Sequence, residues 1–365
     1  MNRKSALFMR VSGGLVLSGI LAAHAQAQSS KPEPTPVEAK STSAALSEIV
    51  VTARRREENI QTVPESVTAI SGAQLSEQRV QSIQDLTTIA PSMISVPTAG
   101  NSRQADAISI RGQGGDNGVV QYFAEVPNAI TPRGTVSFNT TFFDIANVQV
   151  LNGPQGTLFG KTTTGGAILI TPVRPSATPS GYLAVRAGNY NMKEIEGAYG
   201  SSLFGSDKVL FRVAFIKRSR DGFTRNLQGK NVDNVNRDSI RLSLIVRPID
   251  KLENYTIAYY DRVAEQEPGM SITDAFPTIN PAILGQVQAD VAAQKARGPR
   301  VVDLTPFAAH VHVPGIINIT TYDFSEHLHL KNIASYRRER VDNFFSNFDG
   351  SRFPLLDLSR IPGFK

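Results

Sequence analysis

The second half of the chain alternates between apolar and polar residues in segments of about ten residues, separated by polar turns. In one such segment Leu183, Val185 and Ala187 lie on one face and Arg186 lies on the other. Similar segments contain Val209 to Phe215, Ile240 to Val246, Tyr255 to Tyr259 and Leu328 to Tyr336. A period of two predicts β-strands with unlike faces. The pattern is typical of a transmembrane barrel, although a soluble β-sandwich uses the same alternation.

The region from Asn59 to Pro175 has a different pattern, which predicts a small α/β unit. Ser71 with Gln74 fits a capping box at the start of a short helix, and Ser82 with Asp85 fits a second helix start. The predicted elements are strands at 67–70, 107–111 and 119–126, a helix at 83–90 that Pro91 stops, and one helical turn at 142–145.

Residues 147–171, NVQVLNGPQGTLFGKTTTGGAILIT, predict a strand, a glycine-rich loop and a second strand. The segment 156–162 looks like a phosphate-binding loop, but three residues separate its glycines where four are needed, and no helix follows. The segment 111–118 resembles a dinucleotide fingerprint only loosely, and it also leads into a strand. Neither segment therefore predicts a nucleotide site.

The stretch 147–171 resembles the end of the plug domain in TonB-dependent outer-membrane receptors. In that family a V-E-V-L-R-G-P-Q-G-T-L-(F/Y)-G run leads through T-T-G-G-A-I into the last plug strand, and an I-R-G segment matches Ile110 to Gly112 here. The residues that carry this plug motif are Arg111, Gly112, Gly153, Pro154, Gln155, Gly156, Gly160, Gly165 and Gly166.

Three positions depart from the family pattern: Ala124, Gln149 and Asn152 are neutral where the family usually has Asp, Glu and Arg. In the family, charged plug residues near the glycine run are thought to pair with groups that line the barrel. A neutral amide needs only ordinary hydrogen bonds, whereas a buried charge needs a partner. Two readings therefore fit the resemblance: a full-length receptor with an altered contact between plug and barrel, or a truncated product released from that constraint.

The first 27 residues are expected to be a signal peptide. Arg3, Lys4 and Arg10 precede an apolar run from Val11 to Ala23, which is too short for a membrane-spanning helix. Cleavage after Ala27 or after Ala25 fits the small residues that follow, and an uncleaved membrane anchor is the alternative. Residues 28–47 are rich in Pro, Ser, Thr and Ala and predict a flexible periplasmic linker.

A short β-prone patch, Glu48-Ile49-Val50-Val51-Thr52-Ala53, follows the linker. On its own it reads as the first strand of the next domain. Its place between linker and plug resembles the TonB box, the peptide through which the family engages its energising partner.

Composition narrows the possible functions. The chain of 365 residues has no Cys, which excludes disulfides, thiol catalysis and thiolate metal sites. Its net charge of +6 comes without a long basic cluster, so no nucleic-acid partner is expected. No catalytic constellation, cofactor site or metal site stands out; His310 and His312 are read as solvated residues of an outer loop.

The expected architecture is an α+β plug at 54–178, followed from 179 to 365 by antiparallel strands of a transmembrane β-barrel, with a long extracellular loop near 265–314. About seven strands are expected where such barrels have about 22, so the barrel should be incomplete. The chain is expected to be the N-terminal part of a receptor, either a fragment of a longer product or the product of a truncated gene.

The resemblance implies an outer-membrane receptor of a Gram-negative cell, with a periplasmic N-terminus. It would import a scarce nutrient such as an iron-siderophore, cobalamin or glycan, driven by TonB with ExbB and ExbD. The alternative is a non-transporting remnant or a periplasmic plug-like interaction protein.

Overall fold

The computed structural model describes residues 50–51, 58–59, 66–97, 106–114, 118–128, 142–159, 163–266, 271–274, 281–304 and 308–342. The chain divides into two units, Met1–Ser47 and Glu48–Lys365, and every described residue belongs to the second. The expected signal peptide and linker lie outside the described residues. Within them, no helix is long and apolar enough to cross a membrane.

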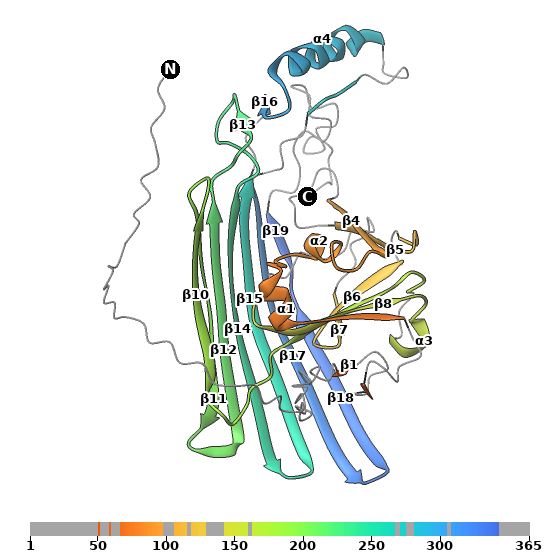
Figure 1. Cartoon of the computed structure of the whole chain (residues 1–365), viewed down its shortest axis with the longest axis vertical. Coiled ribbons are helices and arrows are strands. Elements are labelled where there is room, and N and C mark those ends of the chain that lie inside the picture. Colours follow the sequence, from red (N-terminus) through yellow and green to blue (C-terminus); the bar gives the residue numbers. More distant parts are fainter. Residues whose placement is uncertain are drawn as a thin grey trace, which may run out of the picture. The chain divides into compact units, whose positions relative to one another are not determined.

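The first described domain, the plug, is built on a five-stranded sheet (Figure 1). Its strands, in the order β3-β8-β9-β6-β7, are Val67–Ser71, Ile145–Asn152, Gly166–Pro172, Val119–Phe123 and Val126–Pro127. β6 and β9 are parallel, and the other neighbours are antiparallel. A separate hairpin joins β4 (Met93–Pro97) to β5 (Asp106–Ile110).

Two short helices begin where capping residues predict them. Helix α1 (Gly72–Glu77) starts after Ser71, whose Oγ accepts from the Gln74 backbone N–H at 3.3 Å, while Gln74 Oε1 accepts from the Ser71 N–H at 2.9 Å. Helix α2 (Ile83–Leu86) has Ser82 as its N-cap. It is shorter than the predicted 83–90 because Thr87 and Thr88 donate their hydroxyls to carbonyls three residues back and compete with the helical pattern.

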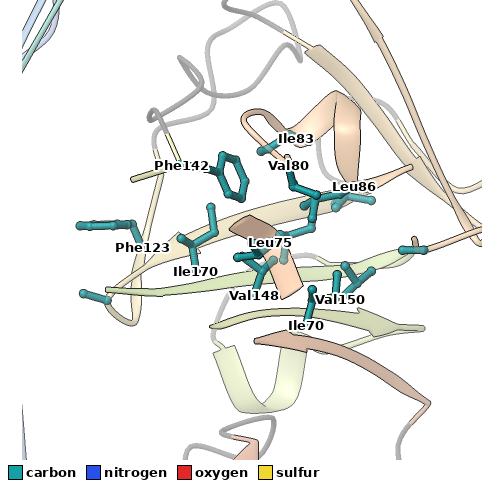
Figure 2. Packing of buried hydrophobic residues seen from close by; sticks show 14 of the residues in the cluster. Ile70, Leu75, Val80, Ile83, Leu86, Phe123, Phe142, Val148, Val150 and Ile170 are labelled. Atoms are coloured by element: carbon teal, nitrogen blue, oxygen red, sulfur yellow. The ribbon is translucent and has the colours of Figure 1, made fainter. Parts of the chain in front are cut away.

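The plug core lies between these helices and the sheet. Figure 2 shows Leu75 from α1 and Leu86 from α2 close to Val148 and Val150 of β8. All four side chains are buried, and they belong to one apolar cluster. Burial of such a side chain contributes about 1.5–3 kcal/mol, so the helices are held by packing on the sheet more than by their own length.

Two plug elements differ from their prediction. The single strand expected at 119–126 is two strands, because Ala124 and Glu125 have φ of +46° and +68° and form a tight turn between β6 and β7. The helical turn expected at 142–145 is absent. Asp144 has φ of +51°, which is incompatible with a right-handed turn, and β8 begins directly after it at Ile145.

After the plug the chain forms an antiparallel sheet of long strands, here called the wall (Figure 1). The strands in spatial order are β10 (Ser180–Gly188), β11 (Met192–Leu203), β12 (Ser206–Arg220), β14 (Val235–Ile249), β15 (Leu252–Gln266), β17 (Ala308–Ser325) and β18 (Leu328–Arg337). A short strand, β19 (Arg340–Asp342), also pairs with β17. Among the described residues this sheet is open, with edges at β10 and β18, as expected for an incomplete barrel.

The wall has an apolar outer face and a largely polar inner face, confirming the predicted alternation. Leu183, Val185 and Leu242 are exposed, whereas Arg212 and Arg241 are buried. This is the reverse of a soluble sheet, in which apolar side chains would be buried. Tyr255 and Ile257 of β15 are an exception, because they face inward and join the apolar cluster of the plug.

Short turns connect the strands at one end of the wall and long loops at the other, where the helix α4 (Pro281–Arg297) lies (Figure 1). The long loop expected at 265–314 is shorter than predicted, since β17 begins at Ala308. His310 and His312 are therefore strand residues, opposite Ala264 and Arg262. They alternate with the buried residues Val311 and Val313, but Pro314 and Gly315 interrupt the pattern in the sequence.

Two of the long loops are joined to each other. Strand β13 (Arg225–Asn226), between β12 and β14, pairs in parallel with β16 (Val301–Val302), between α4 and β17. The Asn226 side chain donates to the Leu304 carbonyl at 2.8 Å and accepts from the Leu304 N–H at 3.0 Å. Val232, Val302 and Leu304 form a small apolar cluster beneath this pairing.

The outer face generates a prediction about lipid contact. Leu242 is the central residue of β14 and is 48% exposed, so Leu242→Arg would place a charge near the middle of the apolar band. We expect it to destabilise the lipid-embedded protein by about 2–4 kcal/mol. The matched control is Leu328→Arg at the first residue of β18, beside a short turn, where about 0–1 kcal/mol is expected. Urea unfolding from lipid vesicles would measure both, and equal effects would contradict a membrane position for the wall.

Candidate functional site at the contact between plug and wall

The glycine-rich stretch of the plug motif is held together by its own backbone. The Gly153 N–H donates to the Gly165 carbonyl at 2.9 Å, and the Gln155 N–H donates to the Thr163 carbonyl at 3.1 Å. Gly166 has φ of +153°, and a Cβ there would lie 2.1 Å from the Leu151 carbonyl oxygen, so only glycine fits. A short helix, α3 (Gly156–Phe159), occupies the loop, which the sequence did not predict; Gly160 lies outside the described residues.

The other part of the plug motif forms a tight turn at the end of β5. Arg111 and Gly112 have φ of +53° and +77°, and the Ile110 and Gln113 backbones bond to each other across them at 3.0 Å. The Arg111 side chain is exposed, whereas its N–H bonds the Ser92 carbonyl at 2.8 Å. These contacts lie within the plug, so the motif shapes the plug's loops.

The neutral residues Ala124, Gln149 and Asn152 also form their hydrogen bonds within the plug. Asn152 accepts from the Ser92 hydroxyl at 2.7 Å and donates to the Ser66 carbonyl at 3.2 Å. The buried Gln149 side chain donates to Asn147 Oδ1 at 2.9 Å, and the Ala124 N–H donates to the Ile170 carbonyl at 3.0 Å. Amide side chains can be buried here because each finds a neutral partner.

A buried charged contact between plug and wall joins Asp144 to Arg212. The Arg212 Nε donates to Asp144 Oδ2 at 2.8 Å, and its Nη2 donates to Oδ1 at 2.5 Å. The two side chains are only 1% and 7% exposed for Asp144 and Arg212 respectively. A bidentate pair of this kind fixes orientation as well as distance, and its burial makes loss of either partner costly.

A second wall arginine is enclosed by the plug. Arg241 Nη2 donates to the carbonyls of Phe143 and Asp144 at 2.9 and 2.8 Å. Its guanidinium lies 4.6 Å from the ring centre of Phe143 and 5.5 Å from that of Phe123. Aromatic faces and backbone carbonyls both stabilise a cation, and Arg241 Nη2 also lies 3.6 Å from Asp144 Oδ2, so neutral groups and one carboxylate together compensate this buried charge.

Further contacts surround this centre. Lys331 Nζ of β18 lies 2.5 Å from Glu125 Oε1 in the β6–β7 turn, and Arg337 Nη1 donates to Asn128 Oδ1 at 2.9 Å. Phe123 also meets Tyr259 of β15 edge-on, with ring centres 6.1 Å apart. The site therefore connects the β6–β7 turn and the start of β8 to strands from β12 to β18.

The residues that form this site were not assigned to it from the sequence. The period-2 pattern places Arg212 and Arg241 on the polar face of their strands, which was the available signal. Asp144 was placed in a helical turn, and nothing local connects it to strands roughly 70 and 100 residues later. Among the described residues, no group of three or more His, Asp or Glu could hold a metal ion.

The expected TonB box, Glu48 to Ala53, is described only at Val50 and Val51. These two residues form β1, which pairs antiparallel with β2 (Glu58–Asn59). The other four residues of the box lie outside the described residues.

The buried pair generates a prediction for a double-mutant cycle. Arg212→Gln removes one partner of Asp144, whereas Asp144→Asn removes the carboxylate that both Arg212 and Arg241 face, and each change should destabilise the protein by about 3–5 kcal/mol. The double variant should cost clearly less than the sum of the two. Urea unfolding of the reconstituted chain, followed by protease cleavage of the plug, would measure the difference.

The control for this cycle is the other plug–wall pair, Glu125 with Lys331. Its side chains are 30% and 38% exposed, so Glu125→Gln and Lys331→Gln should each cost no more than about 1 kcal/mol. Equal effects of the two pairs would show that burial does not govern the contact.

Comparison with known proteins gives the family. Residues 59–167 match the family described as TonB-dependent Receptor Plug Domain. The chain is 27% identical over 161 residues to a ferrioxamine receptor of Yersinia enterocolitica, an alignment that covers 43% of this chain and 22% of the relative. It is 23% identical over 209 residues to the ferrichrome outer membrane transporter/phage receptor of Escherichia coli K12, covering 56% of this chain and 26% of the relative.

The fold is similar to that of the ferric yersiniabactin uptake receptor FyuA from Yersinia pestis, with a TM-score of 0.63 and 19% identity. That similarity covers 77% of this chain and 42% of FyuA. The chain thus spans about a quarter of the length of these curated relatives and under half of this solved structure. Residues 59–167 thus form a plug domain of the TonB-dependent receptor family, and the antiparallel strands with an apolar outer face that follow resemble the barrel wall of those receptors.

Proposed function

We propose that the protein takes part in the TonB-dependent import of an iron-siderophore across the outer membrane of a Gram-negative bacterium. The observation that carries this proposal is the plug held against the polar face of a wall whose other face is apolar. Receptors named for ferrioxamine, ferrichrome and ferric yersiniabactin are among its similar proteins and support an iron chelate, and a vitamin B12 transporter of Vibrio vulnificus, 27% identical over 147 residues, makes cobalamin the second candidate.

The plug–wall contact supports a plug that can move. Asp144, Arg212 and Arg241 hold the plug through hydrogen bonds and ion pairs, which break and re-form without covalent change. Water entering this contact would replace many of the lost bonds, because each intramolecular hydrogen bond contributes only about 0.5–1.5 kcal/mol net. A pull on the plug from the periplasm would therefore meet a barrier that can be crossed.

We further propose that residues 48–53 are the TonB box and that the N-terminus is periplasmic. Val50 and Val51 already adopt an extended conformation, paired on one side with β2. A partner strand would add to such a segment through main-chain hydrogen bonds. TonB, energised by ExbB and ExbD, is the partner that the family supplies.

The box generates a prediction about backbone pairing. Val50→Pro removes a donor and fixes φ, so it should abolish binding of a purified TonB C-terminal domain. Val50→Ala keeps the backbone and should weaken binding far less. Calorimetry or surface plasmon resonance with both variants would decide, and equal losses would mean that the side chain carries the contact.

Import is tested with radioactive iron in receptor-deficient cells that produce this protein. Iron supplied as ferrioxamine, ferrichrome or ferric yersiniabactin should enter at a rate that depends on TonB and is lost with Val50→Pro. The matched control is Val50→Ala, which should retain most of the uptake. Uptake of none of the three chelates, with normal TonB binding, would exclude them as substrates; uptake that persists without TonB would overturn the proposed mechanism.

A further inference from the structure

A cavity of about 550 Å³ lies between helix α1 of the plug and the inner faces of β10 to β12. It is called the plug–wall cavity here. Its lining includes four arginines, Arg79, Arg186, Arg212 and Arg218, and two carboxylates, Asp144 and Glu196. Ser76 of α1 also lines the cavity.

A second cavity of about 260 Å³ adjoins the first, and both are lined by Gln81 and Arg218. It contains Arg220 and Arg237 and lies beside α2. Since Arg237 pairs with Val263, near the end of β15, the second cavity continues toward the long loops. The two cavities thus lie one after the other along the inner wall, from the level of Asp144 toward the outer loops.

Positive and negative side chains lie at different depths along these cavities. Arg186 is 41% exposed, whereas Glu194, which it contacts, has a fully buried side chain. Arg218 contacts the same Glu194, so one carboxylate serves two guanidinium groups. The cations thus face the open space and the buried anion lies behind them.

The more exposed charges of the lining are positive. Six arginines and three carboxylates line the two cavities, and two further carboxylates, Glu194 and Glu265, pair with Arg218 and Arg237 from buried positions. The arginines are Arg79, Arg186, Arg212, Arg218, Arg220 and Arg237, and the carboxylates are Asp85, Asp144 and Glu196. A partly enclosed space lined by one sign of charge raises the local concentration of the opposite ion.

We propose that the plug–wall cavity selects anions and that, resting on the proposed function, the imported chelate is anionic. Carboxylate or other anionic groups of the solute would exchange with Glu196 as partners of the exposed Arg186 guanidinium, whose Nη1 lies 2.8 Å from Glu196 Oε2. A cationic solute would meet Arg79 and the exposed Arg186, whereas the lining carboxylates Asp144 and Glu196 are largely buried and already paired with arginines. The selectivity belongs to the cavity itself and does not require TonB.

The test uses the absence of cysteine from the chain, which makes any introduced thiol unique. Ser76→Cys places a thiol at the cavity lining on α1. The full-length chain in outer-membrane vesicles is treated with a negatively charged sulfonatoethyl thiosulfonate or a positively charged trimethylammonioethyl thiosulfonate. The ratio of the two rates is compared with the ratio for a small thiol in solution.

We expect the ratio of anionic to cationic labelling rates at position 76 to be about tenfold higher than the same ratio for the free thiol. At high salt the ratio at position 76 should fall toward the value of the free thiol. Arg79→Gln should reduce the preference because Arg79 is exposed and lines the cavity. Arg186→Gln should reduce it further. The reference variant is Ser66→Cys, an exposed plug position outside the lining, where no preference is expected.

A ratio at position 76 equal to that of the free thiol, or unchanged by Arg79→Gln and by salt, would overturn the proposal. Arg79 is exposed on the plug, so its substitution tests the proposal even if Arg186→Gln fails to fold. The labelling needs no transport, so an anion preference without uptake separates the cavity from the proposed function. If the protein imports a chelate but labelling at position 76 shows no preference for the anionic reagent, the proposal that the chelate is anionic is overturned.

Discussion

The burial of Arg241 is the constraint on which the assembly of plug and wall depends. A charge removed from water must be compensated. The plug contributes two carbonyls, at 143 and 144, the rings of Phe123 and Phe143, and the Asp144 carboxylate at 3.6 Å. These groups point at the wall only because Asp144 takes a left-handed conformation and Ala124 starts a tight turn. The backbone conformation of the plug therefore also determines how the plug contacts the wall.

The same alternation of residues produces both faces of the wall, but each face is selected for a different contact. Outward positions need only to be apolar, which the sequence displays directly in residues such as Leu183 and Leu242. Inward positions must match the plug at each level, so they include Ile257 and Tyr255 beside the plug core and arginines farther along. The inner face is therefore mixed, and its pattern cannot be understood without the plug.

Local signals predicted local structure well. The capping residues Ser71 and Ser82 mark both helix starts, and period-2 alternation identifies the long strands. Prediction failed where a distant partner decides the conformation, as at Asp144, whose partner Arg212 is 68 residues away. It also failed where Pro314 and Gly315 hid the strand that carries His310 and His312. The motif itself was found, but its glycines serve the plug's own loops rather than the site.

The link between β13 and β16 makes two loops from different hairpins behave as one body. Asn226 satisfies both backbone groups of Leu304, so a change of length in either loop would leave polar groups unpaired in the other. Each loop thereby restricts the conformations open to its neighbour and lowers the entropy lost when a ligand orders them. Their sequences should consequently diverge in step, and a loop transplanted from another protein would have to bring its counterpart with it.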